Sequence, residues 1–229
     1  MTHSNQGYTS QSTMDRFLTP FSRGALRTVA KTITGVKPIW KGCEPETTKT
    51  RVYYANHRSH ADFVLVWSVL PRELRRLTRP VAGADYWDKV GIKRFFGRQV
   101  VNAVLIERNR EGASGVDPVR QMADVVDGGE SLIIFPEGTR NMTDEVMLPF
   151  KSGIYRLALE CPDVEFVPVW VDNLNRVMPK GESVPVPLIC HATFGTPITV
   201  HSHEDKDTFL MRAREALLEL SETQSGEVQ

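Results

Sequence analysis

The amino-acid sequence predicts a single α/β domain in which a mostly parallel or mixed central sheet is flanked by helices. Its 229 residues suit one large domain with a substantial core. Apolar residues make up 41% and charged residues 24% of the chain, as in ordinary globular proteins. Short apolar runs typical of strands alternate with stretches of helical periodicity, and this alternation is typical of a sheet covered by helices.

The predicted strands and helices follow one another from residue 52 onward. Strand-like runs occupy residues 52–55, 100–106, 131–135, 164–171 and 188–194. Helix-like stretches occupy residues 63–70, 85–96, 116–127, 154–160 and 205–220. The Pro-rich residues 178–187 are predicted to form a surface loop, and residues 221–229 a flexible tail.

The N-terminal part of the chain differs from the rest in its charge. Residues 1–43 contain six Lys or Arg residues and one acid, and we expect residues 1–13 to be flexible. Within residues 14–43, apolar side chains recur every three or four positions with basic ones between them, which predicts an amphipathic basic helical segment. This segment either packs on its own domain or contacts an anionic membrane, where each basic residue contributes ~1 kcal/mol. No RNA-binding signature accompanies it, so we do not expect nucleic acid as a partner.

The cysteines and the apolar runs bear on where the protein works. Cys43, Cys161 and Cys190 are odd in number, far apart and without a CxxC pair, which argues against a disulfide framework and against a cysteine-rich zinc site. The polar N-terminus does not resemble a signal peptide, and no apolar run approaches the ~20 residues that span a bilayer. We therefore expect a cytoplasmic protein that is not integral to the membrane.

Polar motifs follow three of the predicted strands. Asn56 and its neighbours follow the first strand, Glu107 and Arg108 follow the second, and residues 136–140 (PEGTR) follow the third. The carboxyl ends of parallel strands meet at one edge of a sheet, where α/β proteins bind their ligands. The three motifs are therefore expected to converge on one crevice.

The first motif, NHRSHAD at residues 56–62, places a histidine close to an aspartate. On a continuous helix His57 and Asp62 would point roughly 140° apart, so they can meet only if His57 precedes the helix. Ser59, followed three residues later by Asp62, matches a capping box and predicts a helix beginning at about His60. Asp62 then either serves the cap alone or also orients the imidazole of His57, whose other nitrogen becomes a general base.

Other chemistries fit the sequence less well. His57, His60 and Asp62, or the HSHED run at residues 201–205, suggest a metal site, but too few histidines are left for a complete zinc shell. We interpret residues 201–205 instead as the capped start of the final helix. The chain lacks a G-x-S-x-G elbow, a P-loop and a GxGxxG motif. A His–Asp pair without its own nucleophile suggests that the substrate brings the attacking group.

The pairing of NHxxxxD at residues 56–62 with FPEGTR at residues 135–140 resembles the glycerolipid acyltransferases, in particular the 1-acylglycerol-3-phosphate acyltransferases. The His-x4-Asp element is weak by itself, but the two motifs together are specific. LIER at residues 105–108, FKSG at residues 150–153 and VPV at residues 167–169 are similar to further blocks of that family, with leucine in place of the usual phenylalanine in the first.

The resemblance implies a glycerol-3-phosphate acyltransferase-like fold in residues 44–220. It also implies transfer of a fatty acyl group from coenzyme A or acyl carrier protein to a hydroxyl of a lysophosphatidate-type glycerolipid. His57 would deprotonate that hydroxyl and Asp62 would orient the imidazole, with no covalent acyl-enzyme and no cofactor. Glycerol 3-phosphate or another lyso-lipid stays open as the acceptor. A metal-dependent hydrolase and a non-catalytic lipid-binding module are less favoured alternatives.

The resemblance further implies a set of acceptor-binding residues: Arg108, Glu137, Gly138, Thr139, Arg140 and Lys151. Guanidinium groups match phosphate oxygens, so the two arginines are suited to clamp the acceptor, with the lysine as an added point charge. Arg108 could instead be a rim charge, and Arg140 could form an ion pair with Glu137. Apolar runs at residues 64–69 and 154–159 either line an acyl tunnel or pack in the core. Such an enzyme would act as a peripheral protein on the cytoplasmic face of the membrane.

Overall fold

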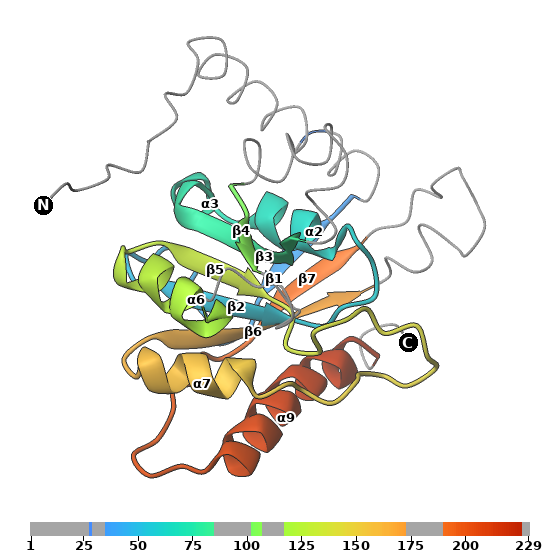
Figure 1. Ribbon diagram of the computed structural model, residues 1–229. Coiled ribbons are helices and arrows are strands. Elements are labelled where there is room, and N and C mark those ends of the chain that lie inside the picture. Colours follow the sequence, from blue (N-terminus) through green and yellow to red (C-terminus); the bar gives the residue numbers. More distant parts are fainter. Residues whose placement is uncertain (1–27, 29–34, 85–101, 107–116, 173–189, 226–229) are drawn as a thin grey trace, which may run out of the picture.

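A computed structural model describes residue 28 and residues 35–84, 102–106, 117–172 and 190–225 of the chain. The described residues contain a seven-stranded sheet with helices on both faces (Figure 1). The strands are β1 (Lys37–Trp40), β2 (Arg51–Ala55), β3 (Thr78–Gly83), β4 (Val104–Ile106), β5 (Ser131–Ile134), β6 (Glu165–Asp172) and β7 (His191–Phe194). The helices are α2 (Asp62–Val69), α3 (Arg72–Leu77), α6 (Pro118–Asp127), α7 (Gly153–Glu160) and α9 (Lys206–Ser225).

The strand order is β1-β7-β6-β2-β5-β3-β4, and every neighbouring pair is parallel except the antiparallel pair β6–β7. Helices α2 and α3 cover one face, while α6, α7 and α9 cover the other (Figure 1). In β2, Val52 and Tyr54 pack toward α6, α7 and α9, whereas Tyr53 and Ala55 pack toward α2. Both faces of the sheet are thus buried, which explains the continuous apolar runs of the central strands. The predicted α/β architecture is confirmed.

Three described elements were not predicted from the sequence. β3 contains Arg79 and Pro80 and therefore does not look like a central strand. Its residues 78–80 pair with β5, and the pairing with β4 begins only at Val81. The short helix α3, with the sequence RELRRL, has too few apolar residues to show a periodicity. The strand β1 lies at the end of the segment predicted to be helical, and it forms because Lys37 to Trp40 pair in register with β7.

Several predicted boundaries need correction or fall outside the described residues. Residues 37–40 of the predicted amphipathic segment 14–43 are a strand, and most of that segment lies outside the described residues. Residues 1–13, the predicted helix 85–96 and the predicted loop 178–187 also lie outside the described residues. Helix α9 continues through Ser225, five residues into the predicted flexible tail. The sequence contains no helix-breaking residue between Leu220 and Gly226, which explains the longer helix.

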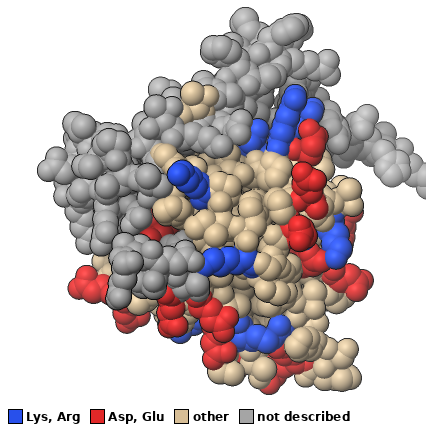
Figure 2. Space-filling model, turned by 180° about the vertical axis from the view of Figure 1, so that it is seen from behind, with Lys and Arg blue, Asp and Glu red and all other residues tan. Residues whose placement is uncertain are grey.

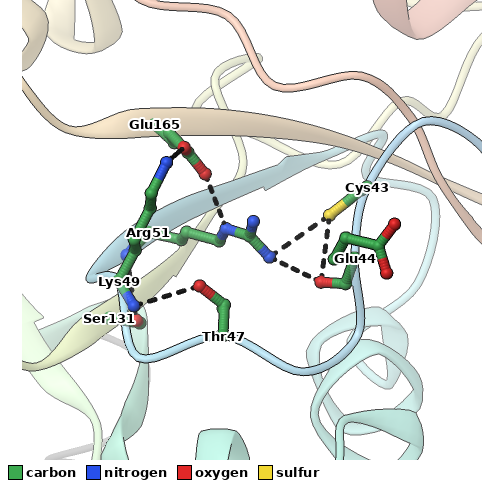
Figure 3. A network of polar contacts seen from close by, with 7 residues as sticks. All are labelled: Cys43, Glu44, Thr47, Lys49, Arg51, Ser131 and Glu165. Atoms are coloured by element: carbon green, nitrogen blue, oxygen red, sulfur yellow. Dashed lines mark hydrogen bonds and ion pairs between the residues drawn. The ribbon is translucent and has the colours of Figure 1, made fainter.

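A polar network connects the first residues of β2, β5 and β6 (Figure 3). It lies at the edge of the sheet opposite the carboxyl ends of these parallel strands. Arg51 is buried, and its Nε donates to Glu165 Oε2 over 2.9 Å while its Nη1 donates to the Glu44 carbonyl over 2.8 Å. Lys49 also pairs with Glu165, and the Arg51 amide donates to Ser131 Oγ over 3.0 Å. The network joins the first residues of β2, β5 and β6 to the preceding loop.

Charged side chains of both signs are intermixed on the face of the described residues shown in Figure 2. The excess of basic residues in residues 1–43 lies largely outside the described residues. No described helix is both long enough and apolar enough to cross a membrane.

Candidate active site

A cleft with a volume of about 390 Å³ lies at the carboxyl edge of the parallel strands. Strands β2 and β5 are parallel neighbours, so the loops that follow them lie side by side. These loops carry the NHxxxxD and PEGTR motifs, and His57 and residues 138–140 line the cleft together. Arg108, the third predicted contributor, lies outside the described residues, although Ile106 at the end of β4 lines the cleft.

Asn56 fixes the point where the chain leaves the sheet. Its Oδ1 accepts a hydrogen bond of 2.7 Å from the Val171 amide, and its Nδ2 donates to the Val171 carbonyl over 2.9 Å. The buried side chain therefore pairs with the backbone of β6 as a further strand residue would. The next residue, His57, begins its loop from a defined position.

The imidazole of His57 is held by an acid and by an aromatic ring. Its Nδ1 lies 3.0 Å from Asp62 Oδ2, and its ring stacks on Phe135 with a centroid distance of 4.1 Å. A carboxylate oxygen only accepts, so this contact places the proton on Nδ1 and leaves Nε2 with its lone pair. The histidine side chain is 16% exposed and lines the cleft, so a ligand can reach it.

Asp62 contacts both of its predicted partners, the Ser59 amide and the imidazole of His57, but Ser59 is not the N-cap of α2, because Ala61 holds that position and no side chain caps it. The carboxylate is 2% exposed, and the same Oδ2 accepts hydrogen bonds from the Arg58 and Ser59 amides over 2.7 and 2.8 Å. Helix α2 begins at Asp62, slightly later than expected, and Ser59 Oγ accepts from the Ala61 amide instead. The local fold that caps the loop therefore also aims the carboxylate at His57.

Glu137 is buried next to the histidine loop. Its Oε1 accepts a hydrogen bond of 2.7 Å from the His57 amide, and its Oε2 accepts one of 2.9 Å from the Leu148 amide. The residue is 1% exposed and does not contribute to the cleft lining in the described part of the chain. Burial raises the pKa of the Glu137 carboxyl above its usual range, although the amides of Leu148 and His57 oppose the shift.

The rest of the PEGTR motif borders the cleft. Gly138 has a φ of 70°, and its amide closes a turn by donating to the Phe135 carbonyl over 3.0 Å. Thr139, Arg140 and Lys151 line the same cleft, and Lys151 is placed by the hydrogen bond of its amide to the Pro136 carbonyl. Arg140 forms no ion pair with Glu137, whose oxygens are bonded to amides.

The cleft is lined by both cationic and apolar side chains. Arg140 and Lys151 are among its cationic residues, and no acidic side chain of the described residues lines it. Its apolar lining comes from the sheet and from helices α6 and α7: Val81, Ile106, Met122, Ile134 and Ile154. Such a site suits an amphiphilic molecule with an anionic head and an apolar chain.

The metal interpretation finds no support among the described residues, where no group of three or more metal-ligating side chains comes together. The HSHED run caps helix α9, as predicted, because Asp205 Oδ1 accepts a hydrogen bond of 2.9 Å from the Thr208 amide. Glu204 in the same run pairs with Arg212 over 2.7 Å.

A model of the acyltransferase family matches residues 44–172, more than half of the chain. The chain belongs to this acyltransferase family. It is 31% identical over 171 residues to the 1-acyl-sn-glycerol-3-phosphate acyltransferase of Cocos nucifera, covering 66% of this chain and 52% of that protein. It is 28% identical over 159 residues to the enzyme of the same name from Saccharomyces cerevisiae, covering 66% of this chain and 48% of that protein. The chain thus spans about half the length of these curated relatives.

The fold is also that of a solved acyltransferase. The structure of PlsC, the 1-acyl-sn-glycerophosphate (LPA) acyltransferase from Thermotoga maritima, is similar with a TM-score of 0.68 and 18% sequence identity. The similarity covers 95% of this chain and 84% of that one. At this identity the likeness shows a shared acyltransferase fold, as the sequence motifs predicted.

Arg58 and Asn141 at the candidate site were not predicted from the sequence. Arg58 Nη2 donates to the carbonyls of Glu145 and Val146 over 2.6 and 3.0 Å. The main-chain N–H of Asn141 donates to the His57 carbonyl over 2.6 Å, and the side-chain Nδ2 of Asn141 donates to the Glu145 carbonyl over 2.8 Å. Both residues join the loop after FPEGTR to the histidine loop. An asparagine directly after the motif was the available signal, because asparagine often anchors loops through its own side chain.

Proposed function

We propose that the chain is an O-acyltransferase that moves a fatty acyl group from an acyl thioester to a hydroxyl of a lysophosphatidate-type glycerolipid. The observation that carries this proposal is the position of the His57–Asp62 pair in the same cleft as Arg140 and Lys151. His57 Nε2 takes the proton of the acceptor hydroxyl, and the buried Asp62 carboxylate stabilises the imidazolium that forms. The hydroxyl oxygen then attacks the thioester carbonyl, and the thiolate leaves with the proton that the imidazolium returns.

The cationic and apolar residues that line the cleft support this choice of substrate. Arg140 and Lys151 provide cations for the acceptor phosphate, and the apolar lining between the sheet and helices α6 and α7 accommodates an acyl chain. The names of the relatives agree, since each refers to 1-acylglycerol 3-phosphate as the acyl acceptor. No cofactor takes part in this reaction.

The donor and the location belong to the same proposal. Coenzyme A and acyl carrier protein both present the acyl group as a thioester, and the chemistry at His57 is the same for either. The basic segment at residues 14–43 would bring the protein to the cytoplasmic face of an anionic membrane as a peripheral enzyme, where its lipid acceptor resides.

Purified protein tests the proposal when it is mixed with one labelled acyl thioester and a panel of acceptors. Thiol release and labelled phosphatidate should both require lysophosphatidate, and His57→Ala should abolish them. Turnover with glycerol 3-phosphate or another lyso-lipid would change the identity of the acceptor in this proposal but leave the acyl-transfer mechanism unchanged. Thioester hydrolysis without any acceptor, activity lost on chelation, or vesicle binding with no turnover would each contradict the proposal.

A further inference from the structure

The main chain of His57 is held at both of its polar groups by the segment that carries PEGTR. Its N–H donates to Glu137 Oε1 over 2.7 Å, and its C=O accepts from the Asn141 amide over 2.6 Å. The Asp62 contact fixes only the imidazole ring. The peptide unit that carries the ring is therefore fixed by residues distant in sequence.

The other oxygen of Glu137 faces a different loop. Oε2 accepts from the Leu148 amide over 2.9 Å, so a single carboxylate joins the histidine loop to the loop that follows PEGTR. The ionised carboxylate accepts strongly at both oxygens, whereas in the protonated form one oxygen carries the hydrogen and is a weaker acceptor. Removing this carboxylate would leave two partly buried amides without their acceptor, which is costly.

Glu137 differs from its neighbours in the PEGTR motif in how far its side chain is exposed. Gly138, Thr139 and Arg140 line the cleft, whereas Glu137 is 1% exposed and turned into the protein. Each carboxylate oxygen accepts from a main-chain amide, and the side chain does not line the cleft in the described part of the chain, so it is not placed to contact an acceptor hydroxyl. Direct contact with the substrate, which the family resemblance implied for Glu137, does not fit this geometry.

We propose that Glu137 is a positioning residue that holds the backbone of the general base His57 at its working distance from the acceptor hydroxyl. This inference rests on the proposed acyl transfer. Asp62 sets the direction of the ring, and Glu137 sets the position of the peptide from which the ring extends. Rate falls steeply with such misplacement, by ~100-fold for about 1 Å.

Glu137→Gln tests the inference with little change in size. Glutamine has one acceptor oxygen, so either the His57 or the Leu148 amide must face its NH2 group, which is also a donor. We expect kcat to fall ~100-fold while the KM for lysophosphatidate stays within about twofold. If Glu137 contacted the acceptor directly, the KM would rise and kcat would change less.

Amide hydrogen exchange provides a second measurement that does not need turnover. In Glu137→Gln the His57 or Leu148 amide should exchange at least about tenfold faster than in the wild type, while the Tyr53 amide in β2 should stay protected. Asp144→Asn, an exposed acid on the same loop, is the control and should change neither exchange nor kcat. Glu137→Asp keeps the charge but is one methylene shorter, and it should lose kcat less severely.

The outcomes separate the inference from the proposed function. Unchanged exchange at both amides, or a raised KM with wild-type kcat, would overturn the positioning role even in an active enzyme. A wild-type protein without acyl transfer would overturn the proposed function, and the exchange result would still show whether Glu137 holds His57. If Glu137→Gln does not fold, Glu137→Asp is assayed in its place for kcat and amide exchange. A wild-type kcat together with unchanged exchange in Glu137→Asp would contradict the inference.

Discussion

Asp62 Oδ2 lies 3.0 Å from His57 Nδ1 and also accepts hydrogen bonds from the main-chain amides of Arg58 and Ser59. The atom that orients the imidazole is thus the atom that shapes the turn into helix α2. Because the carboxylate is buried, its charge acts on the ring with little screening by solvent.

Asp62→Asn should separate the charge of this residue from its geometry. The amide oxygen of asparagine can take the place of Oδ2 and accept from the same three groups, so we expect the fold to persist. The imidazolium would lose its negative partner, and acyl transfer should slow ~10²–10⁴-fold, the usual size of a general-base effect. Steady-state kcat and the melting temperature, measured beside Asp144→Asn, check both expectations. Turnover within a factor of ten of the wild type would contradict the role of the charge.

Arg140→Ala should weaken binding of the anionic acceptor more than it slows the chemical step. A hydrogen bond to a charged group contributes ~1.5–3 kcal/mol, so the KM for lysophosphatidate should rise roughly tenfold to a hundredfold. Arg156→Ala is the matched control, because Arg156 pairs with Asp117 on the surface and does not line the cleft in the described structure. An acceptor KM that is equally affected in both variants would show that Arg140 acts through general charge alone.

The main features of the fold were predictable from the sequence because they depend on burial. The runs that became β2, β5 and β6 are apolar and buried on both faces, as expected for central parallel strands. Strand β3 was not predicted because Arg79 and Pro80 are untypical of a central strand. It forms through its pairing with β5. Long-range pairing of this kind leaves little trace in the local sequence.

The candidate site was predictable to a lesser extent. The spacing of His57 and Asp62 around Ser59 left two possibilities for Asp62, a cap alone or a contact with the imidazole, and the structure contains the contact. The direction of the Glu137 carboxylate was not predictable, because a glutamate in a turn can face the cleft or the protein interior. Only the fold reveals that the His57 and Leu148 amides lie where they capture it.

Gly138→Ala should affect both stability and acceptor binding. The φ of 70° costs a residue with a Cβ roughly 1–2 kcal/mol, and the new Cβ would lie 3.2 Å from Lys151 Cγ. Gly129→Ala is a matched control, since its φ is 81° and its Cβ would meet no described atom within 4 Å. Denaturant unfolding should show similar losses of stability in both variants, and only Gly138→Ala should raise the acceptor KM. An unchanged KM in Gly138→Ala would show that Lys151 does not contact the acceptor.

The ion pair at the start of helix α9 should make stability depend on pH in the acidic range. Glu204 is almost buried, and the hydrogen bond from Arg212 lowers the pKa of its carboxyl below the usual 4.5. A lowered carboxyl pKa contributes stability that is fully present above the unfolded value, and the contribution is lost as the pH falls through the folded value. Glu204→Gln should therefore destabilise the protein by about 1–3 kcal/mol at pH 7, and by progressively less below pH 4.5.

Urea unfolding at pH 7, 5 and about 3.5 measures the free energy of unfolding for the wild type and Glu204→Gln. Glu160→Gln is the control, because Glu160 pairs with Arg120 on the exposed surface, where such pairs contribute little. The difference between wild type and Glu204→Gln should shrink toward the acidic end, while that of Glu160→Gln should stay near zero throughout. A gap that stays constant down to the most acidic sample would show that Glu204 stabilises α9 by packing or neutral hydrogen bonds, with no contribution from its charge.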